Sequence, residues 1–447
     1  MITSYKYHDI QSLNENFTRV ELNGKYGFIN DSGNEIIQFK YQYASSFSFG
    51  LACVHLNGKC GFIDKEGIEI IPFEYDFADD FKDGLTRVKQ NGKWGYIDNQ
   101  NNMVIELKYD LLYPFEDGLA RVKLNNRWGF IDNDGNEVIQ IIYDNAWPEI
   151  EGLIRVKLNN KQGFIDKQGN VVIPLKFDCV DSFIEGLSRV KLNNKWGFID
   201  NRGDEVIPII YDDARCFSEI LAQVKLNGNW GFINHQGEEV IDFKYHNTDP
   251  FIEGISKVEI KNKFGFINKS GFEIIPLMYD WALKFNECLA CVKLIDKYGY
   301  LDKLGSIIIP LIYDGAYGFI DGLSLVKLNG KFGFIDKQGT EIIPIMYDSA
   351  NSFFEGFSIV SINNKFGFID NEGNEIIQLK YEVQSDFKEG MSIVKFKGKY
   401  GFVNIDGVEV IQLIYDCVED FNLGLSKVSL DDKRGYIDKQ GYWVKSL

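Results

Sequence analysis

One glycine recurs at a fixed interval along the entire chain, and this period constrains the fold more than any other feature. It follows an aromatic residue in most copies, and consecutive copies are 34 residues apart with no insertion. The thirteen positions are Gly27, Gly61, Gly95, Gly129, Gly163, Gly197, Gly231, Gly265, Gly299, Gly333, Gly367, Gly401 and Gly435. Such an array buries its core by stacking each unit on its neighbours. We therefore expect a tandem-repeat protein, not the roughly three separate domains that the length prior of about 150 residues per domain suggests.

The repeat has the character of β-strands, although a 34-residue period also occurs in helical solenoids. Glycine and β-branched residues are frequent, and no long stretch spaces apolar residues at i, i+3, i+4 and i+7. Instead, Leu187 to Leu192 and Lys195 to Asp200 alternate on either side of Asn193-Asn194. Asn-Asn and Asn-Gly pairs tolerate the positive φ of a two-residue type I′ turn, so each repeat is predicted to contain a tight β-hairpin.

The two-residue turn also predicts the register of the hairpin, because the residues flanking it must pair. In the sixth repeat the predicted pairs are Leu192 with Lys195, Lys191 with Trp196, Val190 with Gly197, Arg189 with Phe198, and Ser188 with Ile199. One face then carries Val190, whose position is Val in all thirteen copies, and is predicted to be the tightest part of the core. The other face carries cations beside aromatic rings, a contact that contributes about 0.5–1 kcal/mol when exposed.

A third strand and a connector complete the repeat. Turns such as Asp166 to Gly169 precede the third strand, and the connector carries a Tyr-Asp pair such as Tyr211-Asp212. We expect the Tyr to cap the core between repeats and the Asp to close a turn on its own backbone. The prediction is an all-β open superhelix or solenoid of thirteen three-stranded antiparallel repeats. A closed propeller-like ring is the alternative, although propellers usually have four to eight blades.

Both ends of the array differ from the consensus. Residues 1–19 are interpreted as a partial connector or cap with Tyr7 and His8 in the Tyr-Asp places, and residues 20–426 as the tandem repeats. Residues 427–447 are interpreted as a capping repeat, in which Arg434 replaces the aromatic residue and Trp443 with Lys445 is expected to interrupt the third strand.

The sequence resembles the WG-repeat (KWG-repeat) family of bacterial proteins. The resemblance rests on the KWGYID run from Lys93 to Asp98 and the KWGFID run from Lys195 to Asp200, with Ile-Pro and Tyr-Asp downstream. It covers nearly the whole chain and implies a β-rich repeat protein with no shared catalytic residue. Cys60, Gln162 and Arg434 stand where the family has its Trp, so this Trp is interpreted as a flat packing group.

Composition argues against several classes of protein. A net charge of −17 and a pI near 4.8 oppose binding to a nucleic-acid backbone. The longest apolar runs, such as Ile307 to Leu311, are far shorter than a membrane span, and residues 1–8 lack the features of a secretory signal, so we expect a soluble cytoplasmic protein. An odd number of scattered cysteines predicts free thiols. They are Cys53, Cys60, Cys179, Cys216, Cys288, Cys291 and Cys417.

No group of residues has a convincing catalytic or metal-binding pattern. Cys288 and Cys291 have the spacing of a redox motif, but they replace residues of the repeat and no second Cys pair accompanies them. Asp132 to Asn136 resembles the start of a calcium loop but lacks the distal Glu, so a turn is favoured. The four histidines, His8, His55, His235 and His246, fall in three different repeat positions. We therefore predict no enzyme, cofactor or metal.

Variation within the constant repeat is the better guide to function. Large aromatic residues occur near some connector tips, namely Tyr113, Trp147, Trp281 and Tyr317. Aromatic side chains on loops held by a rigid framework are typical of recognition sites, whereas packing against the next repeat is the alternative. The leading hypothesis is a non-catalytic scaffold that mediates protein–protein interaction through these residues. A carbohydrate or cell-envelope polymer binder is the functional alternative.

Overall fold

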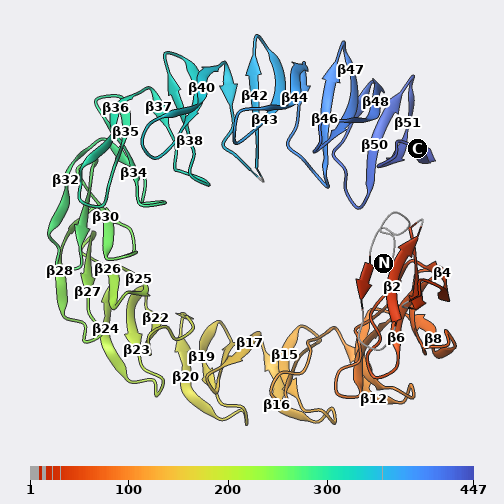
Figure 1. The fold of residues 1–447 in the computed structure, drawn as a ribbon. Helices are drawn as coiled ribbons and strands as arrows, with labels where there is room; N and C mark the ends of the chain where they lie inside the picture. Colours follow the sequence, from red (N-terminus) through yellow and green to blue (C-terminus); the bar gives the residue numbers. More distant parts are fainter. Residues whose placement is uncertain (1–9, 13–16, 23, 31, 355, 447) are drawn as a thin grey trace. The chain divides into compact units, whose positions relative to one another are not determined.

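The described part of the chain consists of β-sheets joined by turns. A computed structural model describes residues 10–12, 17–22, 24–30, 32–354 and 356–446, so Tyr7 and His8 lie outside the described residues. These residues form strands β1 to β52 in thirteen antiparallel sheets, and they include no helix (Figure 1). Accordingly, none of them belongs to a helix long and apolar enough to cross a membrane. The predicted all-β array of thirteen repeats is confirmed.

The sixth sheet shows how one repeat is built. Its strands, in spatial order, are β21 (Cys179–Val180), β22 (Ser188–Leu192), β23 (Lys195–Ile199) and β24 (Glu205–Tyr211). Asn193 and Asn194 join β22 to β23 with φ angles of 51° and 63°, as the type I′ turn requires. All five predicted pairs between β22 and β23 are present. The register expected from the turn is therefore confirmed.

Each sheet has four strands, and the prediction of three-stranded units omitted the short one. The connector residues Cys179 and Val180 pair with Lys191 and Val190 of the next hairpin. Asp178 N donates to Lys191 O at 2.8 Å, which extends this ladder by one residue. The connector of one repeat therefore forms an outer strand of the next sheet, because its extended backbone finds an unpaired edge there.

The core of each sheet lies around the invariant valine. Across the thirteen repeats this side chain is at most 2% exposed, from Val20 to Val428, as predicted. The glycine that pairs with it is required by close backbone approach, because a Cβ at Gly197 would lie 2.7 Å from Ile207 O. The register of β23 against β24 shifts on both sides of Phe198, so the third strand bulges over this glycine.

The second face of the hairpin carries Arg189, Trp196 and Phe198. Phe198 is only 1% exposed, and Arg189 lies over Trp196 at 4.4 Å from the ring centroid. The equivalent Phe164 packs on Phe183 of the following connector, with ring centroids 5.1 Å apart. Lys191 lies over the Trp196 ring at 5.5 Å, which confirms the predicted Lys-Trp contact, while Arg189, the direct partner of Phe198, lies over the same Trp196 ring. The right-handed twist brings diagonal neighbours together, and the phenylalanine packs between repeats instead.

The chain divides into two compact units, Met1–Cys216 (unit 1) and Phe217–Leu447 (unit 2), with the boundary inside β25 (Asp213–Ser218). Within unit 1, one core cluster joins Ile173 of β20 (Val171–Phe177) to Val190 and Ile199 of the next hairpin. Within unit 2, an equivalent cluster joins Ile343 of β40 (Glu341–Tyr347) to Val360. Each core is thus shared by consecutive repeats, as expected for a stacked array.

Candidate functional site

Grooves between successive connectors are the main concave surfaces that recur in the fold. In unit 1, one groove of about 600 Å³ lies between the connectors that carry Asp79 and Pro114, and another of about 380 Å³ lies between those that carry Tyr113 and Pro148. Unit 2 has grooves of about 540 Å³ beside Asp249 and about 470 Å³ beside Asn351. The same repeat position lines all four grooves, so the same geometry creates a groove in both units. Its residues are Asp79, Tyr113, Asp249 and Asn351.

Two residues of the hairpin recur in the lining of each groove. One is the residue before the invariant valine, and the other is the aromatic residue after the glycine. The pairs are Arg87 with Tyr96, Arg121 with Phe130, Lys257 with Phe266, and Ile359 with Phe368. The aromatic member is constant in type, whereas the first member varies from cationic to aliphatic. The grooves therefore share a frame and differ in charge.

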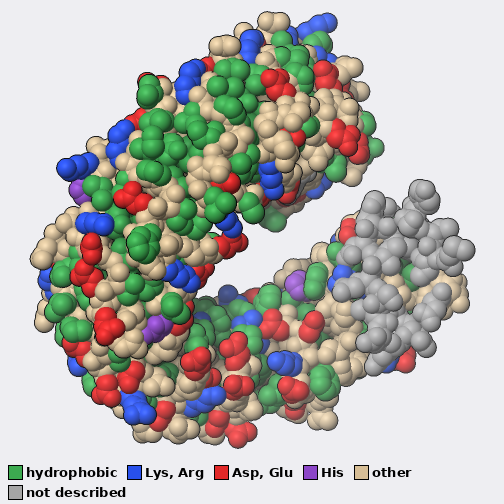
Figure 2. Space-filling model, turned by 60° about the vertical axis from the view of Figure 1, so that its left-hand side comes forward, with side chains coloured by type: hydrophobic (Ala, Val, Ile, Leu, Met, Phe, Trp, Pro, Cys, Tyr) green, Lys and Arg blue, Asp and Glu red, His purple; other side chains and the backbone are tan. Residues whose placement is uncertain are grey.

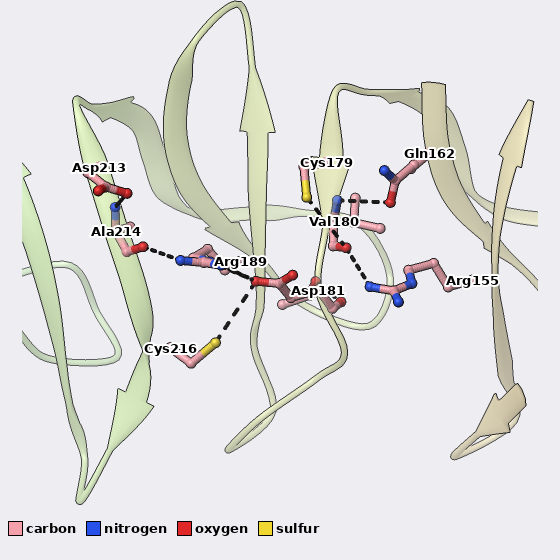
Figure 3. A network of polar contacts seen from close by, with 10 residues as sticks. Arg155, Gln162, Cys179, Val180, Asp181, Arg189, Asp213, Ala214 and Cys216 are labelled. Atoms are coloured by element: carbon pink, nitrogen blue, oxygen red, sulfur yellow. Dashed lines mark hydrogen bonds and ion pairs between the residues drawn. The ribbon is translucent and has the colours of Figure 1, made fainter. Parts of the chain in front are cut away.

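The connector tip, defined as the third residue after the Tyr-Asp aspartate, faces the first of these hairpin residues. At Asp181 the tip forms an ion pair with Arg189 at 2.7 Å (Figure 3). Asp249 and Lys257 form the same pair at 3.3 Å. In both repeats an acidic tip is thus paired with a cation eight residues later.

Two of the four candidate binding residues are aromatic tips, and each packs on an arginine at the same repeat position. The Arg121 guanidinium carbon lies 4.0 Å from the Tyr113 ring centroid, and Arg155 lies 3.9 Å from that of Trp147. Tyr113 is 39% exposed and lines a groove, while Trp147 is half-buried. These two rings belong to successive connectors of unit 1. The cation restricts each ring and covers part of it.

The other two candidates lie in unit 2 and do not share one position. Tyr317 is a tip, is 49% exposed and precedes a hairpin with Leu325 in place of the cation. Trp281 lies two residues before its tip, in β33 (Trp281–Ala282), and its ring is 5.8 Å from that of Tyr298. Each unit thus contains two of the four residues, and only Trp281 is not a tip. Their part in binding stays a prediction.

The hairpin cation also links consecutive repeats. Arg155 donates a hydrogen bond of 2.8 Å to Val180 O, and Arg189 makes the equivalent bond to Ala214 O (Figure 3). Gln162, which stands in place of the family Trp, donates to Asp178 O at 3.4 Å. The lining of the groove is thus also part of the contact between repeats, which fixes its geometry.

The aspartate of the Tyr-Asp pair does not close a turn on its own backbone, and that prediction is wrong. In Asp178, which follows Phe177 in place of the Tyr, Oδ1 accepts a hydrogen bond of 2.6 Å from Lys161 Nζ, and Oδ2 accepts one of 2.9 Å from the Asn193 backbone N–H. Lys161 is the main cause that lowers the pKa of this carboxyl. The aspartate thus joins two consecutive hairpins, because the short connector strand holds it between them.

The Asx geometry occurs instead at the Asp-x-x-Gly turns. Asp132 Oδ1 accepts backbone hydrogen bonds from Asp134 N at 3.0 Å and from Asn136 N at 2.8 Å. This confirms the turn interpretation of the calcium-like segment. Among the residues that the structure describes, no cluster of three or more His, Cys, Asp and Glu side chains is placed to hold a metal ion.

All seven cysteines are free thiols, as predicted. Cys288 is exposed in a turn with φ of 72°, and Cys291 is buried in β34 (Ala290–Leu294). A different thiol group was missed by sequence reasoning. In the second repeat, Cys60 Sγ lies 3.1 Å from His55 Nε2, and Cys53 belongs to the same buried cluster. The sequence could have indicated this group, because Cys53, His55 and Cys60 all depart from the consensus within one repeat.

Comparison with protein families agrees with the repeat geometry. A family model described as WG containing repeat matches thirteen consecutive segments of the chain. The segments are 1–26, 26–60, 61–94, 94–128, 128–161, 163–196, 196–230, 230–264, 264–298, 298–332, 332–366, 366–400 and 400–433. The chain belongs to the WG repeat family. The resemblance noted in the sequence is therefore confirmed.

No curated protein matches this WG-repeat chain. Among solved structures, the extracellular domain of a putative one component system from B. thetaiotaomicron is similar at 7% identity and a TM-score of 0.23, with 98% of this chain and 76% of that chain covered. PorZ, a bacterial surface component of the type-IX secretion system of Porphyromonas gingivalis, is similar at 7% identity and a TM-score of 0.23, with 99% and 81% covered. At these values the likeness carries no functional information.

Proposed function

We propose that this WG-repeat chain is a non-catalytic scaffold that binds a protein partner in the grooves between its connectors. The observation that carries the proposal is the combination of a recurring groove with a variable tip. Asp79, Tyr113, Asp249 and Asn351 occupy one repeat position and line four different grooves. A constant frame with variable contact residues is the arrangement by which repeat proteins present an extended recognition surface.

The aromatic tips supply the anchors that such a surface needs. Tyr113 and Tyr317 are 39% and 49% exposed, so each ring retains area for a partner to bury. Tyr113 is already positioned by Arg121, which reduces the entropy lost on binding. Acidic and basic side chains are interspersed over the face seen in Figure 2, as is usual around the rim of a protein interface.

A carbohydrate or cell-envelope polymer is the second candidate ligand. It is favoured by the partly exposed rings of Tyr113 and Tyr317, since sugars stack on aromatic faces. The Arg121 guanidinium lies over the Tyr113 ring and the Trp128 ring is 6.1 Å away, so a ligand would contact the part of the Tyr113 ring that stays exposed. A protein partner is preferred because the grooves also present paired charges, such as Asp79 with Arg87 at 2.7 Å.

The same proposal includes an open superhelix in the cytoplasm. The support is that thirteen repeats exceed the usual four to eight blades of a closed propeller, and that all seven cysteines are free. Small-angle scattering of the full chain tests the architecture. A compact scattering curve that fits a closed ring would contradict the open form.

Site-specific cross-linking tests the binding site. A photo-reactive amino acid is placed at Pro114, which lines two grooves, and at Gln140, an exposed position on β16 (Glu137–Tyr143), as the control. We expect discrete protein adducts from position 114 only, and no glycan binding on an array. Glycan binding that is lost in Tyr113→Ala would favour the carbohydrate candidate instead.

A further inference from the structure

The second repeat carries a thiol–imidazole cluster on one hairpin. Cys53 and His55 lie on β6 (Ala52–Leu56), and Cys60 lies on β7 (Lys59–Ile63) directly opposite His55. Cys60 Sγ is 3.1 Å from His55 Nε2, and Cys53 lies diagonal to Cys60 across the two strands, in the same core cluster. Cys53 Sγ also donates to Ala78 O at 3.7 Å. Two thiols and one imidazole therefore lie on the same part of this hairpin.

The cluster arises from three coordinated replacements. Cys53, His55 and Cys60 occupy the positions that Arg189, Lys191 and Trp196 occupy in the sixth repeat. There the two cations lie over the ring at 4.4 and 5.5 Å from its centroid. Replacing any one of these residues alone would leave a cation or a large ring without its partner. Replacing all three removes the cations and the ring, and leaves two thiols in one buried cluster.

The two thiols are electrostatically unequal. The neighbouring Cys53 thiol, followed by the His55 imidazole, lowers the pKa of the Cys60 thiol. The neighbouring Cys60 and burial raise the pKa of the Cys53 thiol above its ordinary value. These surroundings favour the thiolate at Cys60 and the protonated thiol at Cys53. A nucleophilic thiolate beside a protonated partner is the arrangement that thiol oxidation requires.

Access to these thiols is restricted by the side chains that cover them. Cys60 is 0% and Cys53 2% exposed. His55, which is half-buried, and Tyr43, which is 43% exposed, form the outer layer, with ring centroids 5.2 Å apart. Movement of these surface side chains would admit hydrogen peroxide, whereas a bulky disulfide reagent would require the hairpin to open.

We propose that Cys53, His55 and Cys60 form a site for oxidation by hydroperoxides, with Cys60 as the attacking sulfur, Cys53 as the resolving thiol and His55 as a positioning residue. The Cys60 thiolate attacks one oxygen of hydrogen peroxide, the O–O bond breaks, and hydroxide leaves and is protonated by solvent. The sulfur of Cys53 then attacks the sulfenic acid on Cys60. The S–S bond forms as the S–O bond breaks, and water leaves with the Cys53 proton. Two thiols are oxidised, and one peroxide is reduced to two waters.

The ninth repeat contains a natural control. Cys291 occupies the same position as Cys53, is equally buried at 2% exposed and has no second cysteine beside it, since Tyr298 stands at the Cys60 position. Burial raises the pKa of the Cys291 thiol to about 12. It is therefore expected to stay reduced under conditions that oxidise Cys60.

The test treats the folded full chain with a small excess of hydrogen peroxide, alkylates it under denaturing conditions and maps the tryptic peptides by mass spectrometry. Lys59 separates the two cysteines, so the disulfide would join peptides 41–59 and 60–65. We expect this cross-linked pair, with Cys291 fully alkylated. Unmodified Cys53 and Cys60, or a sulfenic acid on Cys60 beside free Cys53 at the end of the reaction, would overturn the proposal.

Two variants separate the roles. Cys53→Ser should stop the reaction at a sulfenic acid that a dimedone probe traps on Cys60. His55→Gln should shift the pH midpoint of the peroxide reaction upward from near the value for Cys60, toward that of an ordinary cysteine near pH 8.5. Thermal melting verifies that both variants are folded. An unchanged pH profile in folded His55→Gln would remove His55 from the site.

Discussion

Arg121 donates a hydrogen bond of 2.9 Å to the carbonyl oxygen of Ala146, which lies 25 residues later on β17 (Asn145–Ile150), the outer strand of the next sheet. Arg155 makes the same bond to Val180 at 2.8 Å, and Lys257 makes it to Ala282 at 3.3 Å. The side chain that lines a groove therefore also joins two repeats. Groove geometry and array stability depend on the same atoms.

Removing this bond should destabilise the array. We expect Arg155→Met to lower the free energy of unfolding by about 1–3 kcal/mol, because the buried Val180 carbonyl loses its 2.8 Å hydrogen bond and keeps the weak one from Cys179 Sγ at 4.0 Å. Arg155→Lys is the matched control, since Lys257 makes the bond naturally. Urea unfolding followed by circular dichroism measures both variants. Equal losses for Met and Lys would show that the guanidinium stack on Trp147 matters more than the hydrogen bond.

The core position should tolerate no charge. Val190 is 0% exposed, so Val190→Asp would bury an unpaired carboxylate and should cost about 3 kcal/mol or more. Lys191→Glu, at the next residue on the opposite face, should cost less than about 1 kcal/mol. Thermal melting compares the two. Similar losses in both variants would contradict the assignment of the two faces.

The aspartate that links hairpins should make stability depend on pH. The pKa of Asp178 is lowered in the folded state, chiefly by Lys161, so its contribution is present above the unfolded pKa of about 3.9. That contribution is lost as the pH falls through the lower folded value. We expect Asp178→Asn to be less stable than the native chain at pH 7, with the difference shrinking toward pH 3. Urea midpoints across this range would contradict the link if the difference were constant.

Whole repeats should be removable. Deleting residues 163–196 joins Gln162 to Gly197 and restores the register, because Gln162 and Trp196 occupy the same repeat position. We expect a soluble, folded array of twelve repeats by circular dichroism and size-exclusion chromatography, since each repeat packs mainly on its neighbours. Deleting 163–179 is the control and should not fold correctly. Aggregation of the full-period deletion alone would favour a closed ring.

The aromatic tips should affect binding more than folding. Replacing Tyr113 and Trp147 by Ala should weaken a partner identified by cross-linking by about 2 kcal/mol or more, if the rings are hot spots. Loss of two cation–ring contacts should cost only about 0.5–1 kcal/mol each in stability. Titration and melting of the same variant separate the effects. Unchanged affinity in a stable double variant would exclude these tips from the interface.

Local features of the repeat could be predicted because they depend on short-range geometry. The Asn193-Asn194 turn determines the pairs from Leu192 with Lys195 to Ser188 with Ile199, and the invariant valine marks the core without knowledge of neighbouring repeats. The free state of all seven cysteines followed from their number and spacing in the same way. The turn and the core position could thus be predicted from a few neighbouring residues, and the free thiols from the cysteine positions along the chain.

Contacts between repeats required the three-dimensional arrangement. The bonds from Asp178 to both Lys161 and Asn193, and from Arg155 to Val180, depend on twist and on the connector strand that joins the next sheet. Within one hairpin, the twist likewise decides how close the diagonal residues Cys53 and Cys60 lie, because they are not directly paired. Pairing rules assign partners across one ladder, whereas sheet twist and stacking decide which diagonal and inter-repeat neighbours come within hydrogen-bonding distance.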